Sequence, residues 1–102
     1  MFDWIKEFDG AVTVCNRDFI IVYMNETSIK EFEKYGGEGL IGQNLLDCHN
    51  AVSREMIKEQ MKTGQPHTYI NDKKDGRRKV IHQSPWMEND KIKGLVEISF
   101  YL

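Results

Sequence analysis

The sequence predicts an α+β fold: a five-stranded antiparallel sheet with short helices packed on one face, preceded by an N-terminal amphipathic helix. Three observations predict it. Segments rich in β-branched and aromatic residues occur twice near the start of the chain and three times in its last third. The middle of the chain instead carries helix caps and glycine breaks. The dipeptide Asp75-Gly76, one of the strongest hairpin signals, separates two of the late strand segments.

Residues 1–10 predict the amphipathic helix, and residues 11–102 predict the domain that follows it. Phe2, Ile5 and Phe8 recur at a three-residue spacing, and Gly10 is placed to end the helix. A short helix with this much apolar surface must cover the sheet or a second subunit. We therefore expect a homodimer formed through Phe2, Trp4, Ile5 and Phe8.

A hairpin and a helix come next. The segments Ala11–Cys15 and Phe19–Met24 favour strands, and the polar turn at residues 16–18 joins them. A helix follows, for which the available caps are Asn25, Thr27 or Ser28. Gly36-Gly37 then breaks it.

The rest of the middle third predicts brief helical turns and one longer helix. The apolar pieces between residues 40 and 46 are too short for more than one or two turns. Ser53 is a good N-cap for the longer helix, and Gly64 closes it. Val52, just before the cap, can pack against Ile57 as a hydrophobic staple.

Three strands complete the predicted sheet. They cover Pro66–Asn71, about Arg78–Trp86 and Leu95–Leu102. In the last one, apolar residues alternate with a mixed set; the two sets are Val96, Ile98, Phe100 and Leu102 against Glu97, Ser99 and Tyr101. This alternation predicts one buried face and one mixed face.

Composition and charge narrow the function. With 102 residues and a formal net charge of -2, the chain has no broad positive field that would bind phosphates, so we expect no nucleic-acid partner and no membrane partner. No apolar run approaches the roughly 20 residues that span a bilayer, so we expect a cytoplasmic protein. Cys15 and Cys48 form no Cys-x-x-Cys pair, so we expect reduced thiols.

Several segments, taken in order, resemble PAS domains. Residues 16–25 resemble their turn, second strand and helix-initiating asparagine, and Leu40-Ile41-Gly42 is similar to their "iG" element. Thr63–Pro66 resembles their "G-x-P" step into the third strand, and Lys91–Val96 resembles the start of their final strand. The resemblance covers Ala11 to Leu102 and implies the PAS fold.

The resemblance also implies a function in signal transduction. A PAS pocket between sheet and helices takes up haem, flavin or a small metabolite, or stays empty while the domain serves as a dimerisation surface. The implied partners are a small-molecule ligand, a second copy, and an effector domain or partner protein, with the ligand left open. Gly42–Asn50 is similar to the "G-x-x-x-x-x-C-H" element of PAS domains attached to hemerythrin-like regulatory proteins. We expect a free-standing module or part of a larger receptor, without a kinase, cyclase or DNA-binding segment.

The resemblance argues against a covalently bound flavin and leaves haem as an alternative cofactor. Light-oxygen-voltage PAS domains have "G-x-N-C-R-F-L-Q" at this place, whereas here Asn44 is followed by Leu45, so we expect no cysteinyl-flavin adduct. A haem-binding gas or redox sensor is an alternative, because a neutral His49 imidazole is an effective axial iron ligand. The competing interpretation places His49 in the turn before the Ser53 helix, bonded to free backbone groups.

Other residues are candidates for the pocket wall. His82 and Ser84 alternate with Ile81 and Gln83, so one of these pairs must face the helices, and the sequence does not decide which. Polar groups on that face would orient a ligand. The candidate cofactor-binding residues are His49, Tyr23, Asn25, Phe32, Asn44, Met56, His82, Ser84 and Trp86.

Other chemistry has less support. Adjacent side chains such as Cys48 and His49 seldom face each other, so we expect no catalytic residue and no enzyme. A small α+β enzyme and a binding module without a signalling role remain alternatives. The histidines and cysteines lack the paired spacing of zinc sites, so we expect no metal. The basic residues around Asp75-Gly76, including Lys79, are interpreted as the solvated surface of a hairpin tip.

Overall fold

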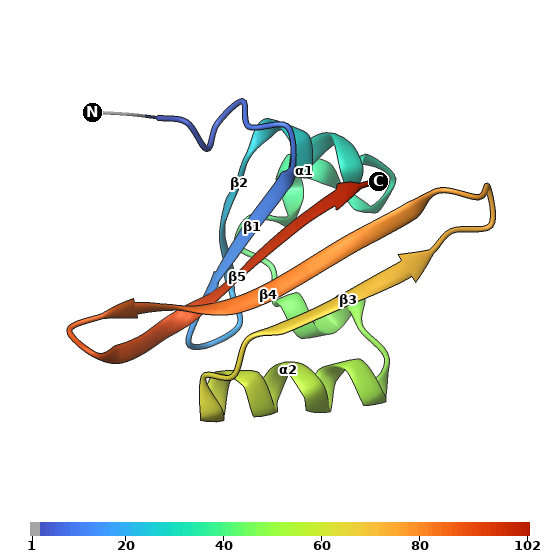
Figure 1. Cartoon of the computed structure of the whole chain (residues 1–102). Helices are drawn as coiled ribbons and strands as arrows, with labels where there is room; N and C mark the ends of the chain where they lie inside the picture. The colour runs from blue at the N-terminus through green and yellow to red at the C-terminus, as the bar shows by residue number, and fades with distance from the viewer. Residues whose placement is uncertain (1–2) are drawn as a thin grey trace.

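Two hairpin units, joined through the last strand, make one sheet. The structure, a computed structural model, describes residues 3–102. Its five strands pair antiparallel in the order β2-β1-β5-β4-β3 (Figure 1). They are β1 (Ala11–Asn16), β2 (Ile21–Met24), β3 (His67–Asp72), β4 (Arg78–Glu88) and β5 (Lys91–Tyr101). The predicted α+β class and the five-stranded antiparallel sheet are confirmed.

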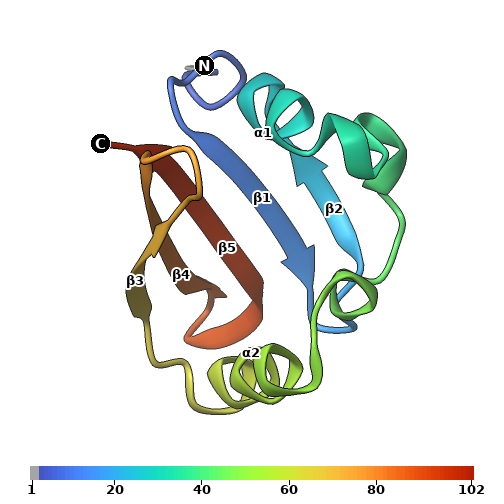
Figure 2. The same cartoon turned by 90° about the vertical axis from the view of Figure 1, so that its right-hand side faces the viewer.

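Helical segments occupy the stretch between β2 and β3. The α-helices are α1 (Glu26–Glu31) and α2 (Ala51–Thr63), and short 3-10 turns cover η1 (Glu33–Tyr35), η2 (Gly37–Leu40) and η3 (Leu45–Cys48). Figure 2 shows these segments on the concave side of the curved sheet. The predicted brief turns are therefore confirmed. Within residues 3–102, neither α-helix has the length and apolar character needed to cross a bilayer.

Asparagine side chains begin both α-helices. Asn25 caps α1, because its Oδ1 accepts a hydrogen bond from the Ser28 backbone N–H at 2.9 Å. The N-cap predicted for α2 is wrong by three residues: Asn50 is the cap instead of Ser53, and its Oδ1 accepts from the N–H of Ser53 at 2.9 Å. Val52 is 72% exposed, so the predicted staple is not formed. Gly64 ends α2 as predicted, with φ of 73°.

The predicted N-terminal helix is not formed in the described part of its range, residues 3–10. Residues 4–7 make a turn instead. Its carbonyls accept hydrogen bonds from residues at the start of α1. The carbonyl of Ile5 accepts from Asn25 Nδ2, and that of Lys6 accepts from the Glu26 N–H. The carbonyl of Phe8 accepts from Thr27 Oγ1. The segment therefore completes the start of α1, and Phe2 lies outside the described residues.

The alternation in β5 is present, but the mixed set is the one that faces the helices. Ser99 is 2% exposed, whereas its neighbour Phe100 is 43% exposed. In the antiparallel register Glu97 pairs with Gln83 and Ser99 pairs with Ile81, and Gln83 and Ile81 are both buried. The side that carries Ile98 and Phe100 is consequently the outer face of the sheet, which corrects the expected burial of the apolar set.

Candidate functional site

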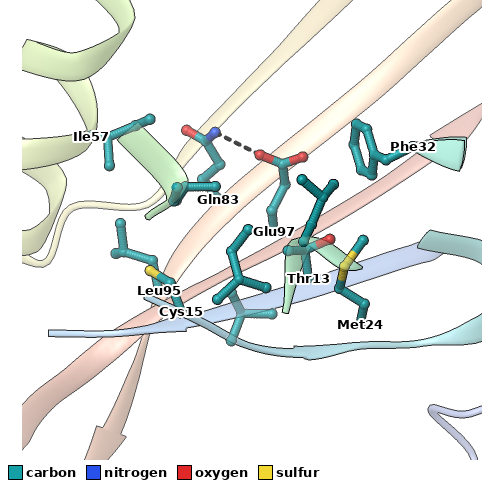
Figure 3. A pocket seen from close by; sticks show the side chains of 12 residues that line it. Thr13, Cys15, Met24, Phe32, Ile57, Gln83, Leu95 and Glu97 are labelled. Atoms are coloured by element: carbon teal, nitrogen blue, oxygen red, sulfur yellow. Dashed lines mark hydrogen bonds between the residues drawn. The ribbon is translucent and has the colours of Figure 1, made fainter. Parts of the chain in front are cut away.

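The sheet and the helices enclose an apolar cavity of about 70 Å³, here called the chamber (Figure 3). The sheet contributes residues that point to its concave face, and α1, α2 and the 3-10 turns close the other side. The lining residues are Thr13, Cys15, Ile21, Met24, Phe32, Leu40, Leu45, Ile57, Gln83, Leu95, Val96 and Glu97. Almost all of this wall is apolar, which makes its few polar groups decisive for what it can bind.

One polar pair stands in the chamber wall. Gln83 on β4 and Glu97 on β5 lie directly opposite each other in the strand register. Gln83 Nε2 donates a hydrogen bond to Glu97 Oε2 at 3.0 Å (Figure 3). A carboxylate is acceptor-only, so the amide N–H must face it, and the amide oxygen points away. The pair is the polar end of an otherwise apolar space.

The other polar groups of the chamber are already satisfied or inert. Thr13 Oγ1 shares a hydrogen bond with Ser28 Oγ at 2.5 Å. Burial raises the pKa of the Cys15 thiol, and hydrogen bonds from backbone groups offset this only in part. The thiol is therefore protonated and poorly nucleophilic at neutral pH.

A larger, open groove of about 680 Å³, here called the cleft, adjoins the chamber and shares Phe32, Leu40 and Glu97 with it. Lys79 lies in its wall with a side chain only 6% exposed, and its Nζ is 3.0 Å from Glu31 Oε1. This corrects the interpretation of Lys79 as solvated surface.

Glu31 is the centre of a small network in this cleft. The Tyr101 hydroxyl donates to Glu31 Oε1 at 2.5 Å. Burial acts to raise the pKa of Glu31, but the hydrogen bonds from Tyr101 and Lys79 outweigh it and hold that pKa below its ordinary value. Burial, followed by the bond to Glu31, raises the pKa of Tyr101. The network fixes α1 against the ends of β4 and β5.

His49 lies beside a third pocket of about 320 Å³, which shares Ile57 and Gln83 with the chamber. Its Nδ1 is 2.8 Å from the carbonyl of Leu45, so the ring donates to that oxygen and leaves Nε2 as an acceptor. The ring thus makes the kind of backbone bond that the turn interpretation predicts.

Similar folds are found among solved structures, whereas no protein-family model and no curated protein matches the chain. VqmA bound to DPO superposes with a TM-score of 0.74 at 18% identity, covering 97% of this chain and 55% of that one. The PAS domain of histidine kinase ThkA superposes with a TM-score of 0.72 at 17% identity, covering 89% of this chain and 97% of that one. This chain has the PAS fold.

A further PAS-fold structure corrects an expectation drawn from charge. The VqmA–ligand–DNA complex from Vibrio cholerae has a TM-score of 0.73 at 18% identity, covering 96% of this chain and 48% of that one. The chain spans about half the length of the VqmA chains that it matches. Since a protein with this fold is found in a DNA complex, the exclusion of nucleic acid was wrong: the net charge of one domain does not decide what a longer protein binds.

Three predicted site residues lie on pocket walls of this PAS fold. Phe32 lines both the chamber and the cleft. His49 lines the cleft and the third pocket, and Met56 lines the third pocket. All three come from the helical side, where the sequence placed them.

Four other candidates lie on the outer face of the sheet. Thr13, Cys15 and Gln83 line the chamber, so the residues that alternate with them point away from it. Of the two alternating pairs on β4, Ile81 and Gln83 are therefore the pair that faces the helices. The outward candidates are Tyr23, His82, Ser84 and Trp86.

Two asparagine candidates serve as caps and are absent from the chamber wall. Asn25 is 1% exposed and bonds only to backbone groups. Asn44 caps η3, where its Oδ1 accepts from the Leu46 N–H at 2.8 Å. Their polar groups are used in folding, and this is why they do not line the chamber.

Sequence reasoning missed the polar pair. Glu97 sits among apolar residues in a strand, and Gln83 holds the matching position on the neighbouring strand. One feature of the sequence could have indicated it: the charged Glu97 stands two positions before the small, buried Ser99 and therefore lies on the same face of the strand. Without the register, this signal does not say which face is inward.

The chamber does not fit haem or a flavin ring. A cavity of about 150 Å³ accommodates one benzene molecule. The chamber has about half that volume, whereas haem and flavin are fused or linked multi-ring systems. In the described residues no three His, Cys, Asp or Glu side chains are grouped to hold a metal ion.

Proposed function

We propose that this chain is a sensory or regulatory module that binds a small ligand in the chamber. The observation that carries the proposal is the Gln83–Glu97 pair, which places hydrogen-bonding groups in an otherwise apolar cavity. Small-molecule sites have this character: apolar walls with a few placed polar groups. VqmA, which has a similar fold, is bound to DPO, and ThkA is a histidine kinase. Both support a role in signalling.

The size of the chamber bounds the ligand. About 70 Å³ admits a compact group of a few heavy atoms. A larger ligand would extend past Phe32 and Leu40 into the cleft, since both residues line both spaces. Binding then acts on the fold by favouring whichever arrangement of the helical turns encloses the ligand best.

The test is an NMR titration of the ¹⁵N-labelled chain with isobutanol, a neutral probe that would fill the chamber and extend past Phe32 and Leu40 into the cleft. We expect saturable shift changes at chamber residues such as Leu95 and Ile57. The variant Leu40→Trp fills the opening between chamber and cleft and should abolish them. Ile41→Trp is the matched control, because Ile41 is the exposed neighbour and lines neither space. Absence of saturable shifts in the unaltered chain, or equal binding in Leu40→Trp, would contradict the proposal.

We also propose that the N-terminal segment mediates dimerisation. Trp4 and Phe8 form an edge-to-face pair with ring centroids 5.3 Å apart, and Trp4 is 57% exposed. Exposed aromatic pairs of this kind are typical of interaction surfaces. The paired carbonyls of the segment hold it against α1, so the rings are presented on an ordered backbone.

Light scattering tests dimerisation. Trp4→Ser combined with Phe8→Ser should convert a dimer to a monomer, whereas Val52→Ser, at an exposed apolar residue of α2, should not. A monomer in the unaltered chain would refute the proposal. The similarity of Gly42–Asn50 to hemerythrin-associated PAS domains leads us to propose a regulatory protein of that kind as the setting of the module.

A further inference from the structure

Glu97 is the one charged side chain among the residues that line the chamber. Its Oε2 accepts from Gln83, and no other hydrogen bond to its carboxylate is formed within residues 3–102. Nor does it belong to any ion pair of this part of the chain. Within residues 3–102, the carboxylate of Glu97 therefore has no cation in contact with it.

Two cations that line the cleft beside Glu97 are paired with other carboxylates, and Lys73 and Lys74, which also line it, form no ion pair with Glu97. Lys79 is paired with Glu31 at 3.0 Å, and it stands four residues along β4 from Gln83, roughly 13 Å at the usual rise per residue. Arg77 is paired with Asp75 at 2.8 Å in the hairpin loop. None of these cations is paired with Glu97, so its carboxylate is available to a cationic ligand.

The hydrogen-bonding groups of the chamber are also unbalanced. The amide N–H of Gln83 is directed at Glu97, which leaves the Gln83 oxygen as a second acceptor (Figure 3). The Thr13 hydroxyl is occupied by Ser28. Free acceptors thus exceed free donors, and a ligand that fits must bring donors of its own.

We propose that the ligand is a small cation: a protonated amine on a compact apolar body, with the ammonium against Glu97 and the body against Leu95 and Ile57. This deepens the proposed function and rests on it. An ammonium supplies both the missing positive charge and several N–H donors, and charge-assisted hydrogen bonds are about twice as strong as neutral ones. The apolar body replaces water along the rest of the wall.

Three probes of matched shape test the inference: isobutylamine, isobutanol and isobutyrate, each titrated into the ¹⁵N-labelled full chain at neutral pH. We expect isobutylamine to bind about tenfold more tightly than isobutanol, and isobutyrate not to saturate. In Glu97→Gln the advantage of the amine should disappear while isobutanol binding persists, which also shows that the variant is folded. Glu88→Gln, at an exposed residue of the same hairpin, should change nothing.

The outcomes separate the two proposals. If isobutanol binds and isobutylamine binds no more tightly, or if the amine keeps its advantage in Glu97→Gln, the cation inference fails and the ligand chamber stands. Tightest binding of isobutyrate would likewise overturn it, and would place recognition at the lysines that line the cleft, which are Lys34, Lys73, Lys74 and Lys79. If none of the probes saturates in the unaltered chain, the proposed function fails as well. The selectivity of the unaltered chain decides the matter even where a variant does not fold.

Discussion

The carboxylate of Glu31 and the ammonium of Lys79 lie 3.0 Å apart and join α1 to the concave face of β4. Lys79 is almost fully buried, so removing Glu31 leaves an uncompensated charge inside the protein. We expect Glu31→Gln to lower the free energy of unfolding by about 3 kcal/mol in urea titrations. The double variant Glu31→Gln with Lys79→Met should be less destabilised than the single one.

An exposed pair gives the control for this prediction. Asp72 and Arg78 are 2.8 Å apart, and both side chains are more than half exposed. Asp72→Asn should therefore cost less than about 1 kcal/mol. Equal losses in Asp72→Asn and Glu31→Gln would show that burial does not govern the Glu31–Lys79 pair.

The same carboxylate makes stability depend on pH. The pKa of Glu31 is held below its ordinary value of 4.5, so the folded state binds a proton less readily than the unfolded chain does. The stability that ionised Glu31 gives the folded state is complete above pH 4.5, and it is lost as the pH falls through the lower pKa of the folded state. Between about pH 6 and about pH 3, the urea midpoint should fall less steeply in Glu31→Gln than in the unaltered chain. Parallel curves would contradict this assignment.

Asn25 ties three parts of the chain together. Its Oδ1 accepts from the N–H groups of Val12 and Ser28, and its Nδ2 donates to the carbonyls of Ile5 and Gly10. Because all of these bonds are lost together, Asn25→Ala should destabilise the fold by about 3 kcal/mol or more. Thermal or urea unfolding measures the loss.

Asn50→Ala is the matched control for Asn25→Ala. Asn50 also caps an α-helix, but it is exposed and its side chain accepts a single hydrogen bond from Ser53. Its loss should cost about 1 kcal/mol. If both variants lose the same stability, the contacts of Asn25 beyond helix capping contribute nothing.

Gly94 permits a close approach at the centre of the sheet. A Cβ at this position would overlap the carbonyl oxygen of Cys15 and Nε1 of Trp86. Those two groups are hydrogen-bonded to each other at 3.1 Å, so neither can move without breaking the bond. Gly94→Ala should therefore cost more than about 3 kcal/mol, whereas Gly39→Ala, with open space around it, should be nearly neutral. Circular dichroism during heating distinguishes the two, and a stable Gly94→Ala would rule out the overlap.

Local signals were sufficient for most elements of the fold. The hairpin at Asp75-Gly76 and the end of α2 at Gly64 follow from backbone preferences of residues near in sequence. The start of α2 was misplaced because Asn50 and Ser53 both offer an acceptor for capping, and only the structure shows that Asn50 is the one used. The N-terminal helix failed for a non-local reason: its carbonyls are bonded to residues about twenty positions away.

The candidate site was harder to predict than the fold. Phe32, His49 and Met56 lie on pocket walls because the helical segments were placed correctly. The polar pair escaped prediction because the inward face of a strand depends on its register with its neighbours, and the hydrophobic pattern of β5 favoured the opposite face. A polar group that serves a cavity breaks the rule that apolar residues turn inward, so pattern alone points away from it.

The strand order has a consequence for biosynthesis. β5 is made last, yet it lies between β1 and β4 and supplies the only strand pairing between the two hairpins in the described sheet. A chain emerging from the ribosome would hold two separate hairpins with open edges until β5 arrives between them. Such edges can pair with other chains, so slow translation of the residues that form β5 would lengthen the period in which aggregation competes with folding.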